Sequence, residues 1–281
     1  MERAKIRLHV EHPLGPGQAV PLTEPQAHYL FGVMRLAAGA AVSLFNGTDG
    51  EWRARVLRAA KRGGDLTCEA QTAPQIDPPD LWLMFAPLKK ARTDFIVEKA
   101  VELGAARIMP VQTEFTSSDR IRPDKQQLHA IEAAEQCGAT FVPPVAELAP
   151  LARMLSAWDP RRRILWADES LAGPGAAALP ALAAQAPAQG PGPAGQGQGP
   201  ASPVQQPGPG QQPAPGQGPG QGPGPWAILI GPEGGFSPAE VARLRAAPFV
   251  VPVSLGPRIL RAETAALAAL VMWQSALGDW R

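Results

Sequence analysis

The sequence predicts an α/β protein with a small β-rich part before residue 75 and a larger part in which strands and helices alternate. Two observations lead to this fold class. Up to residue 74, short alternating or apolar runs are separated by glycine-containing turns, a pattern typical of a small β-barrel. From residue 81, apolar runs of strand length alternate with segments of helical pattern, which indicates a parallel sheet covered by helices. The length of 281 residues is enough for about two domains.

The β-rich domain is expected to span residues 1–74 and to contain four strands and one helix. The helix is expected near residues 24–36, and Asn46-Gly47 and Asp49-Gly50 mark turns between strands. The strands are expected at 5–10, 41–46, 51–59 and 65–70. Prolines within residues 74–79 predict a linker to the second domain, which is expected to span 80–281.

The second domain is expected to contain five strands and four helices. The strands are expected at 81–86, 107–111, 163–166, 227–230 and 249–253. The helices are expected at 93–103, 125–137, 237–247 and 262–277. Gly104 and Gly138 stand where a left-handed C-terminal cap would end the first two helices. Ser237 and Glu240 form a capping box with Pro238 at the first helical position, so a helix should begin there.

A low-complexity insertion divides the second domain at about residues 173–225. Residues 186–225 are mostly Pro, Gly and Gln, and Val204 is the only large aliphatic residue among them. Such a composition cannot offset the entropy lost on ordering the chain. We therefore predict a disordered surface insertion and favour this interpretation over a binding device.

Charge and cysteine content narrow the function classes. The chain carries 26 Lys and Arg against 25 Asp and Glu, which excludes a polycationic tail that grips nucleic acid by charge alone. Any basic surface must therefore be local. The longest uncharged stretch contains no continuous apolar run, so no membrane helix is expected. Cys68 and Cys137 fit neither a metal spacing nor a disulfide framework, which favours the reducing cytoplasm and predicts no metal site.

Two glycine-containing loops follow the last two strands and are the candidate binding loops. The first, IGPEGGF at 230–236, lies between a buried strand and the capped helix. Glycines let a ligand approach the backbone, and a helix N-terminus offers unpaired N–H groups. The loop matches neither a dinucleotide fingerprint nor a Walker loop. By itself it is equally consistent with a tight turn and with a binding role.

The second loop, SLGPRILRAETA at 254–265, places two arginines and a carboxylate at the start of an apolar helix. Glu263 suits the positive end of the helix dipole, whereas Arg261 is electrostatically unfavourable there. An anionic partner would explain the arginine.

These loops and three further segments resemble the ribosomal RNA small subunit methyltransferase E family, which belongs to the SPOUT class. The similar segments occur in the same order and cover nearly the whole chain outside the insertion. They are HYLFGVMRLAAG at 28–39, PLKKARTDFIVEKAVELGA at 87–105, IEAAEQCG at 131–138, LIGPEGGFS at 229–237 and LGPRILRAETAAL at 255–267. Departures from the usual pattern include Ala40, Val101 and Ala139, none of which lies in the two loops.

The resemblance implies an N-terminal PUA-like RNA-binding β-barrel followed by a SPOUT-type α/β domain with a C-terminal trefoil knot. It implies a homodimeric, S-adenosyl-L-methionine-dependent enzyme. The reaction would be methylation of N3 of a uridine, conventional position 1498, in 16S ribosomal RNA of the small subunit. No metal is required for this chemistry.

The resemblance also assigns candidate site residues. Cofactor-binding residues would be Ile230, Gly231, Glu233, Gly234, Leu255, Gly256, Ile259 and Leu260. Most would act through backbone groups, while the three at 255, 259 and 260 would pack on the adenine or serve as ordinary core. Arg261 or Arg258 would stabilise the negative charge that develops on the uracil. Glu263 or Glu233 would take the N3 proton or orient an arginine, and we favour orientation.

Candidate RNA-binding residues lie in both domains. They are Arg35, Arg53, Lys89, Lys90 and Arg92. The three basic residues after the first strand of the second domain would contact phosphate, and a solvated turn is the alternative. Trp52 and Tyr29 have the chemistry to stack on bases, but we favour packing within the barrel.

Two alternatives remain open on the sequence. A noncatalytic RNA-binding protein of the same fold would be expected to lose the cofactor loops, and here they are intact. Knotted methyltransferases also modify ribose oxygens and other bases. The N-terminal barrel and the intervening segments favour the uridine N3 target.

Overall fold

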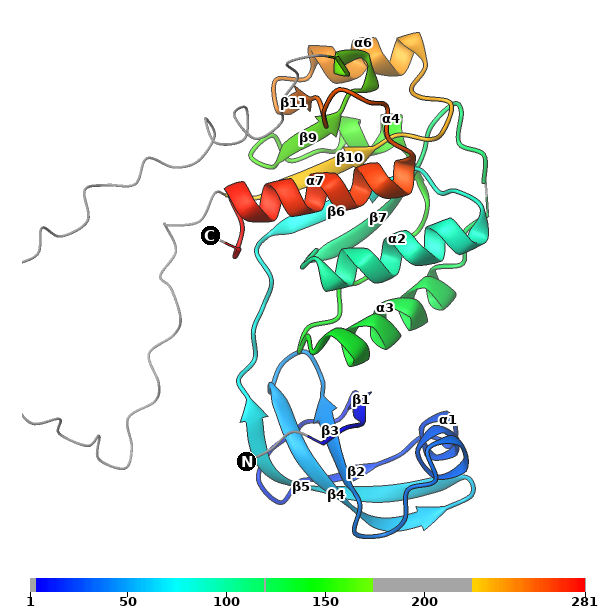
Figure 1. Ribbon diagram of the computed structural model, residues 1–281, viewed down its shortest axis with the longest axis vertical. Helices are drawn as coiled ribbons and strands as arrows, with labels where there is room; N and C mark the ends of the chain where they lie inside the picture. Colours follow the sequence, from blue (N-terminus) through cyan, green and yellow to red (C-terminus); the bar gives the residue numbers. More distant parts are fainter. Residues whose placement is uncertain (1–3, 119, 174–223, 281) are drawn as a thin grey trace, which may run out of the picture.

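The computed structural model describes residues 4–118, 120–173 and 224–280. Nearly all of the predicted insertion therefore lies outside the described residues. Figure 1 shows a twisted sheet that carries the N-terminus and, beyond it, a second sheet flanked by helices. The two-part α/β architecture predicted from the sequence is thus present. The exact domain boundary at residues 74–80 stays a prediction.

The N-terminal sheet has five strands in the order β1-β3-β4-β5-β2. Their bounds are β1 (Arg7–His9), β2 (Ala19–Pro21), β3 (Ala41–Phe45), β4 (Glu51–Ala60) and β5 (Gly63–Ala73). The pair β1 and β3 is parallel, and the other pairs are antiparallel. Four strands were predicted close to these positions. The strand β2 was not predicted, because three residues are too few to show an alternation.

The predicted helix at 24–36 is present in two parts and ends at residue 33. A capping box on Thr23 starts α1 (Glu24–Ala27), which continues directly as the π-helix η1 (His28–Val33). The wider turns are visible in the hydrogen bond from Met34 N to Tyr29 O, which spans five residues. This segment buries Leu30 completely in the core of the N-terminal sheet.

The turn before β4 depends on Gly50, which gives the first testable prediction. Its φ is +76°, and a Cβ there would clash with Ala73 O and lie 2.8 Å from Gln75 N. Gly50→Ala should lower the free energy of unfolding by more than the roughly 1–3 kcal/mol that left-handed strain alone costs. Gly17→Ala is the matched control, since its φ is +73° and its Cβ would meet nothing within 4 Å. Equal losses in urea unfolding of the two variants would refute the steric argument.

The second sheet has six strands, and every pairing in it is parallel. The strand order is β11-β9-β10-β6-β7-β8. The bounds are β6 (Leu81–Phe85), β7 (Arg107–Gln112), β8 (Ala149–Pro150), β9 (Arg163–Ala167), β10 (Trp226–Ile230) and β11 (Val250–Val253). All five predicted strands are confirmed, and only the two-residue β8 was not foreseen. The trefoil knot stays a prediction.

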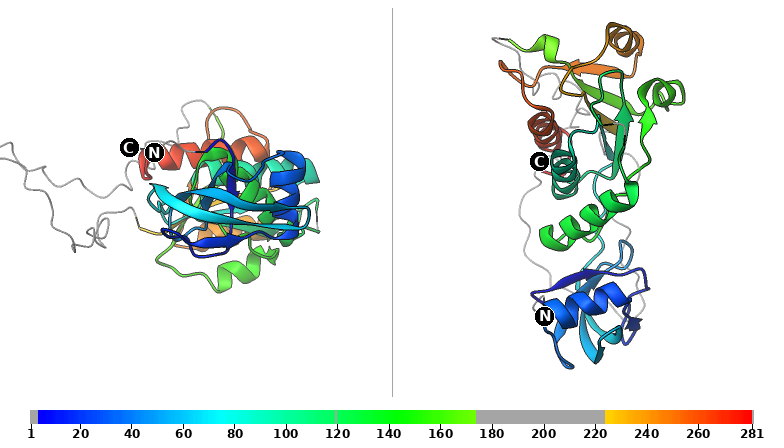
Figure 2. Two further views of the ribbon diagram at one scale, coloured as in Figure 1. Left: turned by 90° about the horizontal axis from the view of Figure 1, so that it is seen from below. Right: turned by 90° about the vertical axis from the view of Figure 1, so that its right-hand side faces the viewer.

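Helices cover both faces of this sheet (Figure 2). On one face lie α2 (Lys90–Glu102), α3 (Pro123–Cys137) and α7 (Ala262–Ala276). On the other lie α4 (Leu151–Ser156), which was not predicted, and α6 (Pro238–Ala246). A short 3-10 turn, η2 (Glu169–Leu171), follows β9.

The central strand β10 shows why the sheet needs helices on both sides. Trp226, Ile228 and Ile230 pack with α2, α3 and α7, whereas Ala227 and Leu229 pack with α4 and α6. All five residues are buried, because successive side chains of a strand point to opposite faces. An uninterrupted apolar run is therefore required here.

The predicted helix ends are confirmed where they depend on local chemistry. Gly138 caps α3 with a φ of +85°, and Gly104 follows α2 with a φ of +74°. The capping box of α6 is formed, with Ser237 N donating to Glu240 Oε2 at 2.9 Å. The starts of α2 and α3 lie two to three residues earlier than predicted, at positions without a side-chain cap.

Candidate functional site

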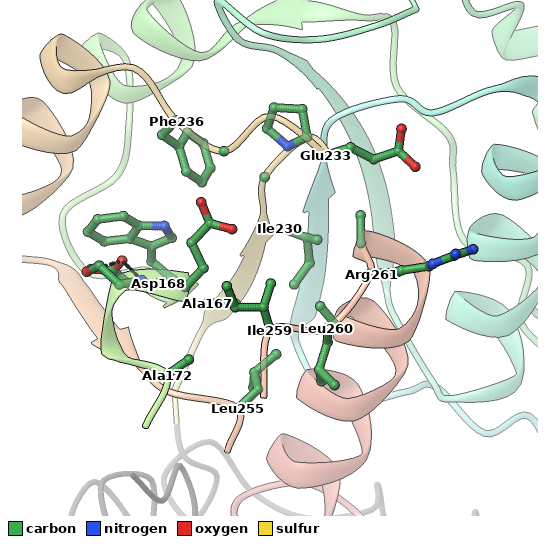
Figure 3. Close-up of a pocket in the computed structure, with 18 of the residues that line it drawn as sticks. Ala167, Asp168, Ala172, Ile230, Glu233, Phe236, Leu255, Ile259, Leu260 and Arg261 are labelled. Atoms are coloured by element: carbon green, nitrogen blue, oxygen red, sulfur yellow. Dashed lines mark hydrogen bonds between the residues drawn. The ribbon is translucent and has the colours of Figure 1, made fainter. Parts of the chain in front are cut away.

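The loops that follow β9, β10 and β11 enclose a cavity of about 500 Å³. Because the strands are parallel, these loops leave the sheet at the same edge. That edge is where ligands bind in open α/β sheets, and the volume is typical of a small-molecule site. The two glycine loops predicted from the sequence contribute most of the wall (Figure 3).

Seven of the eight predicted cofactor-binding residues line this cavity. They are Ile230, Gly231, Glu233, Leu255, Gly256, Ile259 and Leu260. The exception is Gly234, where a Cβ would lie 3.2 Å from the Cβ of Phe115. The structure therefore brings the two loops together, although their cofactor-binding role stays a prediction.

One wall of the cavity is apolar. Leu255 and Leu260 are half-buried and pack against the main core, and their contact with a cofactor stays a prediction. Ile259 lines the cavity and is 72% exposed. Figure 3 shows these three side chains around one side of the cavity. The wall offers apolar contact to a flat ring.

The opposite wall is polar and was missed in the sequence. Asp168 is buried and accepts hydrogen bonds from Ser170 N at 3.0 Å and Ser170 Oγ at 2.7 Å. Arg245 of α6 lies 3.3 Å from the same carboxylate, and Glu169 completes this part of the wall. The available signal was the polar run that directly follows a predicted strand, since strand ends at one edge converge.

Phe236 lines the cavity and packs against a residue of the sheet. Its ring meets the buried ring of Trp166 edge to face, with centroids 5.8 Å apart. A Cβ on Gly231 would lie 2.7 Å from the Phe236 ring. The absence of a side chain at 231 therefore lets the aromatic ring pack where it does.

The two predicted catalytic arginines lie at the rim. Arg258 and Arg261 both line the cavity and are exposed. Among the described residues, neither guanidinium has a carboxylate within ion-pair distance. Arg261 also stands at the N-cap of α7, where the helix dipole disfavours a cation. The two guanidinium groups are therefore available to an anionic partner.

Arg92 lies on α2 and connects the two loops through its ion pairs. Near the start of α2, its guanidinium forms an ion pair with Glu233, and its Nε lies 3.7 Å from Glu263 Oε1. Glu263 does not line the cavity, and its Oε2 is buried without a hydrogen-bond partner in the described part of the chain. This geometry supports an orienting role for Glu263 over a role as a base. A phosphate contact by Arg92 would compete with two carboxylates.

The other candidate RNA residues lie outside the cavity. Lys89 and Lys90 are exposed at the start of α2. Arg35 is exposed in the N-terminal domain, and Arg53 pairs there with Glu69 at 3.4 Å. The exposure of these residues and the ion pair of Arg53 do not test the predicted RNA contacts.

Trp52 and Tyr29 are half-buried against the core of the N-terminal sheet, and Trp52 Nε1 donates to Asp49 O at 2.9 Å. This supports the packing interpretation for both.

Across residues 4–118, 120–173 and 224–280, no three His, Cys, Asp or Glu side chains are gathered as metal ligands. Within the same ranges, no helix has the length and apolar character to cross a membrane.

Comparisons with known sequences match both domains. An RNA methyltransferase domain matches residues 76–190 and 214–274, and an RNA methyltransferase PUA domain matches residues 22–67. A Synechocystis protein named Ribosomal RNA small subunit methyltransferase E is 29% identical over 256 residues, covering 89% of this chain and 71% of that protein.

Solved structures share the whole fold. A Legionella pneumophila protein, described as a methyltransferase in complex with its bound cofactor SAM, matches with a TM-score of 0.74 and 26% identity. The match covers 99% of this chain and 100% of that one. A Ribosomal RNA small subunit methyltransferase E from Neisseria gonorrhoeae matches with a TM-score of 0.72 and 24% identity, over 98% and 99% of the two chains.

Proposed function

This chain belongs to the RNA methyltransferase family, and we propose that it methylates 16S ribosomal RNA of the small subunit with S-adenosyl-L-methionine as the methyl donor. The proposed target is N3 of a uridine, at conventional position 1498. The observation that carries the proposal is the cavity built by the two predicted loops at the edge of the parallel sheet. The name of the Synechocystis relative and the cofactor in the Legionella structure support it.

The cavity fits the proposed methyl donor. Its volume of about 500 Å³ accommodates a nucleoside with an amino-acid side arm. Leu255, Ile259 and Leu260 would pack on the adenine ring. Gly231 and Gly256 line the cavity without side chains, so a ligand could approach the backbone closely there. When bound, S-adenosyl-L-methionine supplies a methyl group activated by a sulfonium.

The residues of the chain would act mainly by positioning and by charge. Uracil N3 must lose its proton, and the resulting negative charge spreads onto the neighbouring carbonyl oxygens. Arg261 or Arg258, exposed at the cavity rim, would stabilise that charge. Glu263 contacts Arg92 and stands outside the cavity, so we assign it a positioning role. Alignment of N3 with the methyl group should contribute much of the rate enhancement.

We also propose that the protein acts as a homodimer in the cytoplasm. The family resemblance supports the dimer. Val271 is an exposed aliphatic residue of α7, which is consistent with a subunit contact. Sedimentation of the purified protein measures its oligomeric state directly.

The reaction is tested by incubating the purified protein with labelled S-adenosyl-L-methionine and small subunits that lack the modification. Nucleoside mass spectrometry of the digested RNA should then show new 3-methyluridine. A different methylated nucleoside would refute the target atom. Cofactor binding without methylation would refute the substrate, and absence of both would favour a noncatalytic RNA-binding protein.

Arg92 gives a prediction about the ion-pair cluster. Arg92→Ala leaves two neighbouring carboxylates without their shared cation, so the loops carrying Glu233 and Glu263 should separate. We expect kcat for methylation to fall by about tenfold or more, with Arg92→Lys retaining more activity than Arg92→Ala. A phosphate-binding role would instead raise the KM for the small subunit and leave kcat unchanged.

A further inference from the structure

We propose that Arg7 is a positioning residue that holds the N-terminal sheet at a set angle to the methyltransferase domain, and thereby presents the RNA to the cavity. This inference rests on the proposed function. Arg7 lies on β1, while the groups it contacts lie on β4 and at the end of α3. Its guanidinium makes hydrogen bonds to groups of both domains.

The guanidinium of Arg7 binds the C-terminal end of α3. Its Nη1 donates to Ala134 O and to Glu135 O, the latter at 3.0 Å, and its Nη2 donates to Ala139 O at 2.8 Å. The last four carbonyls of a helix have no partner within the helix. A cation at this end also suits the helix dipole. Arg7 therefore supplies hydrogen bonds that α3 cannot make for itself.

Arg7 also contacts side chains of the N-terminal sheet. Its Nε lies 2.7 Å from Glu51 Oε2, and the Glu51 side chain is 0% exposed. Thr72 Oγ1 donates to the second carboxylate oxygen at 2.7 Å. The guanidinium also lies 4.4 Å from the centroid of the Phe45 ring. A buried ion pair adds little net stability, but breaking it by removing one partner is strongly destabilising, so these groups hold Arg7 in one place.

Two further hydrogen bonds accompany this connection. His9 N donates to Glu135 Oε1 at 2.9 Å, and Ile76 N donates to Thr140 Oγ1 at 3.1 Å. Both reach the same end of α3. The guanidinium has five N–H donors in a rigid plane, enough for three carbonyls and a carboxylate at once, whereas a lysine ammonium has three. Loss of Arg7 should therefore loosen the angle without releasing the domains.

The angle matters because the two domains have different tasks. In the proposed function, the N-terminal PUA-like domain contacts the ribosomal RNA and the cavity holds the methyl donor. A fixed angle pre-organises both for the same RNA, so less freedom is lost on binding. Arg7 should accordingly affect the affinity for the small subunit, and neither cofactor affinity nor turnover at saturation.

The test uses Arg7→Met combined with Glu51→Gln, because Arg7→Met alone would remove the Arg7 cation from beside the buried Glu51 carboxylate. Spin labels at Leu57 of β4 and Leu128 of α3, both exposed, report the distance between the domains after Cys137→Ser. The labelled full-length protein is diluted with unlabelled protein. The distance distribution should widen in the double variant. The KM for small subunits should rise by about tenfold or more, while kcat and the cofactor Kd stay within about twofold.

Arg58→Met is the matched control, since Arg58 is exposed and pairs with Asp65 between β4 and β5, within the N-terminal sheet. Arg7→Lys should give a KM between the wild type and the double variant. An unchanged distance distribution, or a widened one with an unchanged KM, would overturn the proposal. If the wild type fails to methylate small subunits, the proposed reaction is refuted, whereas the spin labels still decide whether Arg7 holds the domains.

Discussion

Replacing Arg261 with alanine is expected to abolish methylation of small-subunit RNA while the affinity for S-adenosyl-L-methionine stays within about twofold of the wild-type value. Arg261 lines the cavity, is exposed, and stands where the dipole of α7 disfavours a cation. A charge kept in an unfavourable place is explained by a partner that appears during the reaction. Removal of one group that stabilises developing charge typically costs about 10²–10³ in kcat.

The measurement is methyl transfer at saturating cofactor, with cofactor binding followed by calorimetry. Arg243→Ala is a suitable control because Arg243 is exposed on α6 and does not line the cavity. Arg258→Ala decides between the two candidate cations. Methylation by Arg261→Ala at the wild-type rate would remove this residue from the mechanism.

Replacing Gly231 with valine is expected to weaken binding of S-adenosyl-L-methionine by about tenfold or more, which corresponds to about 1.4 kcal/mol for each tenfold. The new Cβ would lie 2.7 Å from the Phe236 ring, so the ring must move from its place against Trp166. Because these residues line the cavity, the movement and the added methyl groups reduce the space for the ligand.

Gly234→Ala separates this effect from general damage to the loop. Gly234 belongs to the same loop but does not line the cavity, and its Cβ would lie 3.2 Å from Phe115. We expect cofactor affinity within about threefold of wild type for Gly234→Ala. Similar losses in the two variants would show that the loop conformation, and not the cavity wall, determines binding.

Those parts of the candidate site that are formed by consecutive residues could be predicted from the sequence. The resemblance to the ribosomal RNA small subunit methyltransferase E family is confirmed, and so is the PUA-like domain followed by a parallel α/β domain. The two loops could be found because glycine, proline and capping residues act within a few positions of one another. The polar wall at Asp168 was not found, because its significance depends on which strands lie side by side.

Local chemistry determined most of the secondary structure. The uninterrupted apolar run of β10, the capping box at Ser237 and the left-handed Gly138 are readable in the sequence, because each depends on neighbouring residues. The π-helix η1 was not readable in this way. Its wider turns place Leu30 in a core formed by residues far along the chain.

Only the tertiary structure decided which distant charges meet. Arg92 reaches Glu233 across 141 positions, and Arg7 reaches the end of α3 across more than 120. These contacts follow from the strand order, which inserts β10 between β9 and β6, and from the docking of β1 on α3. Periodicity specifies which face of an element is buried, but it carries no information about which element will cover that face. The sequence by itself therefore determined the elements and the binding loops, and long-range packing determined the charged connections between them.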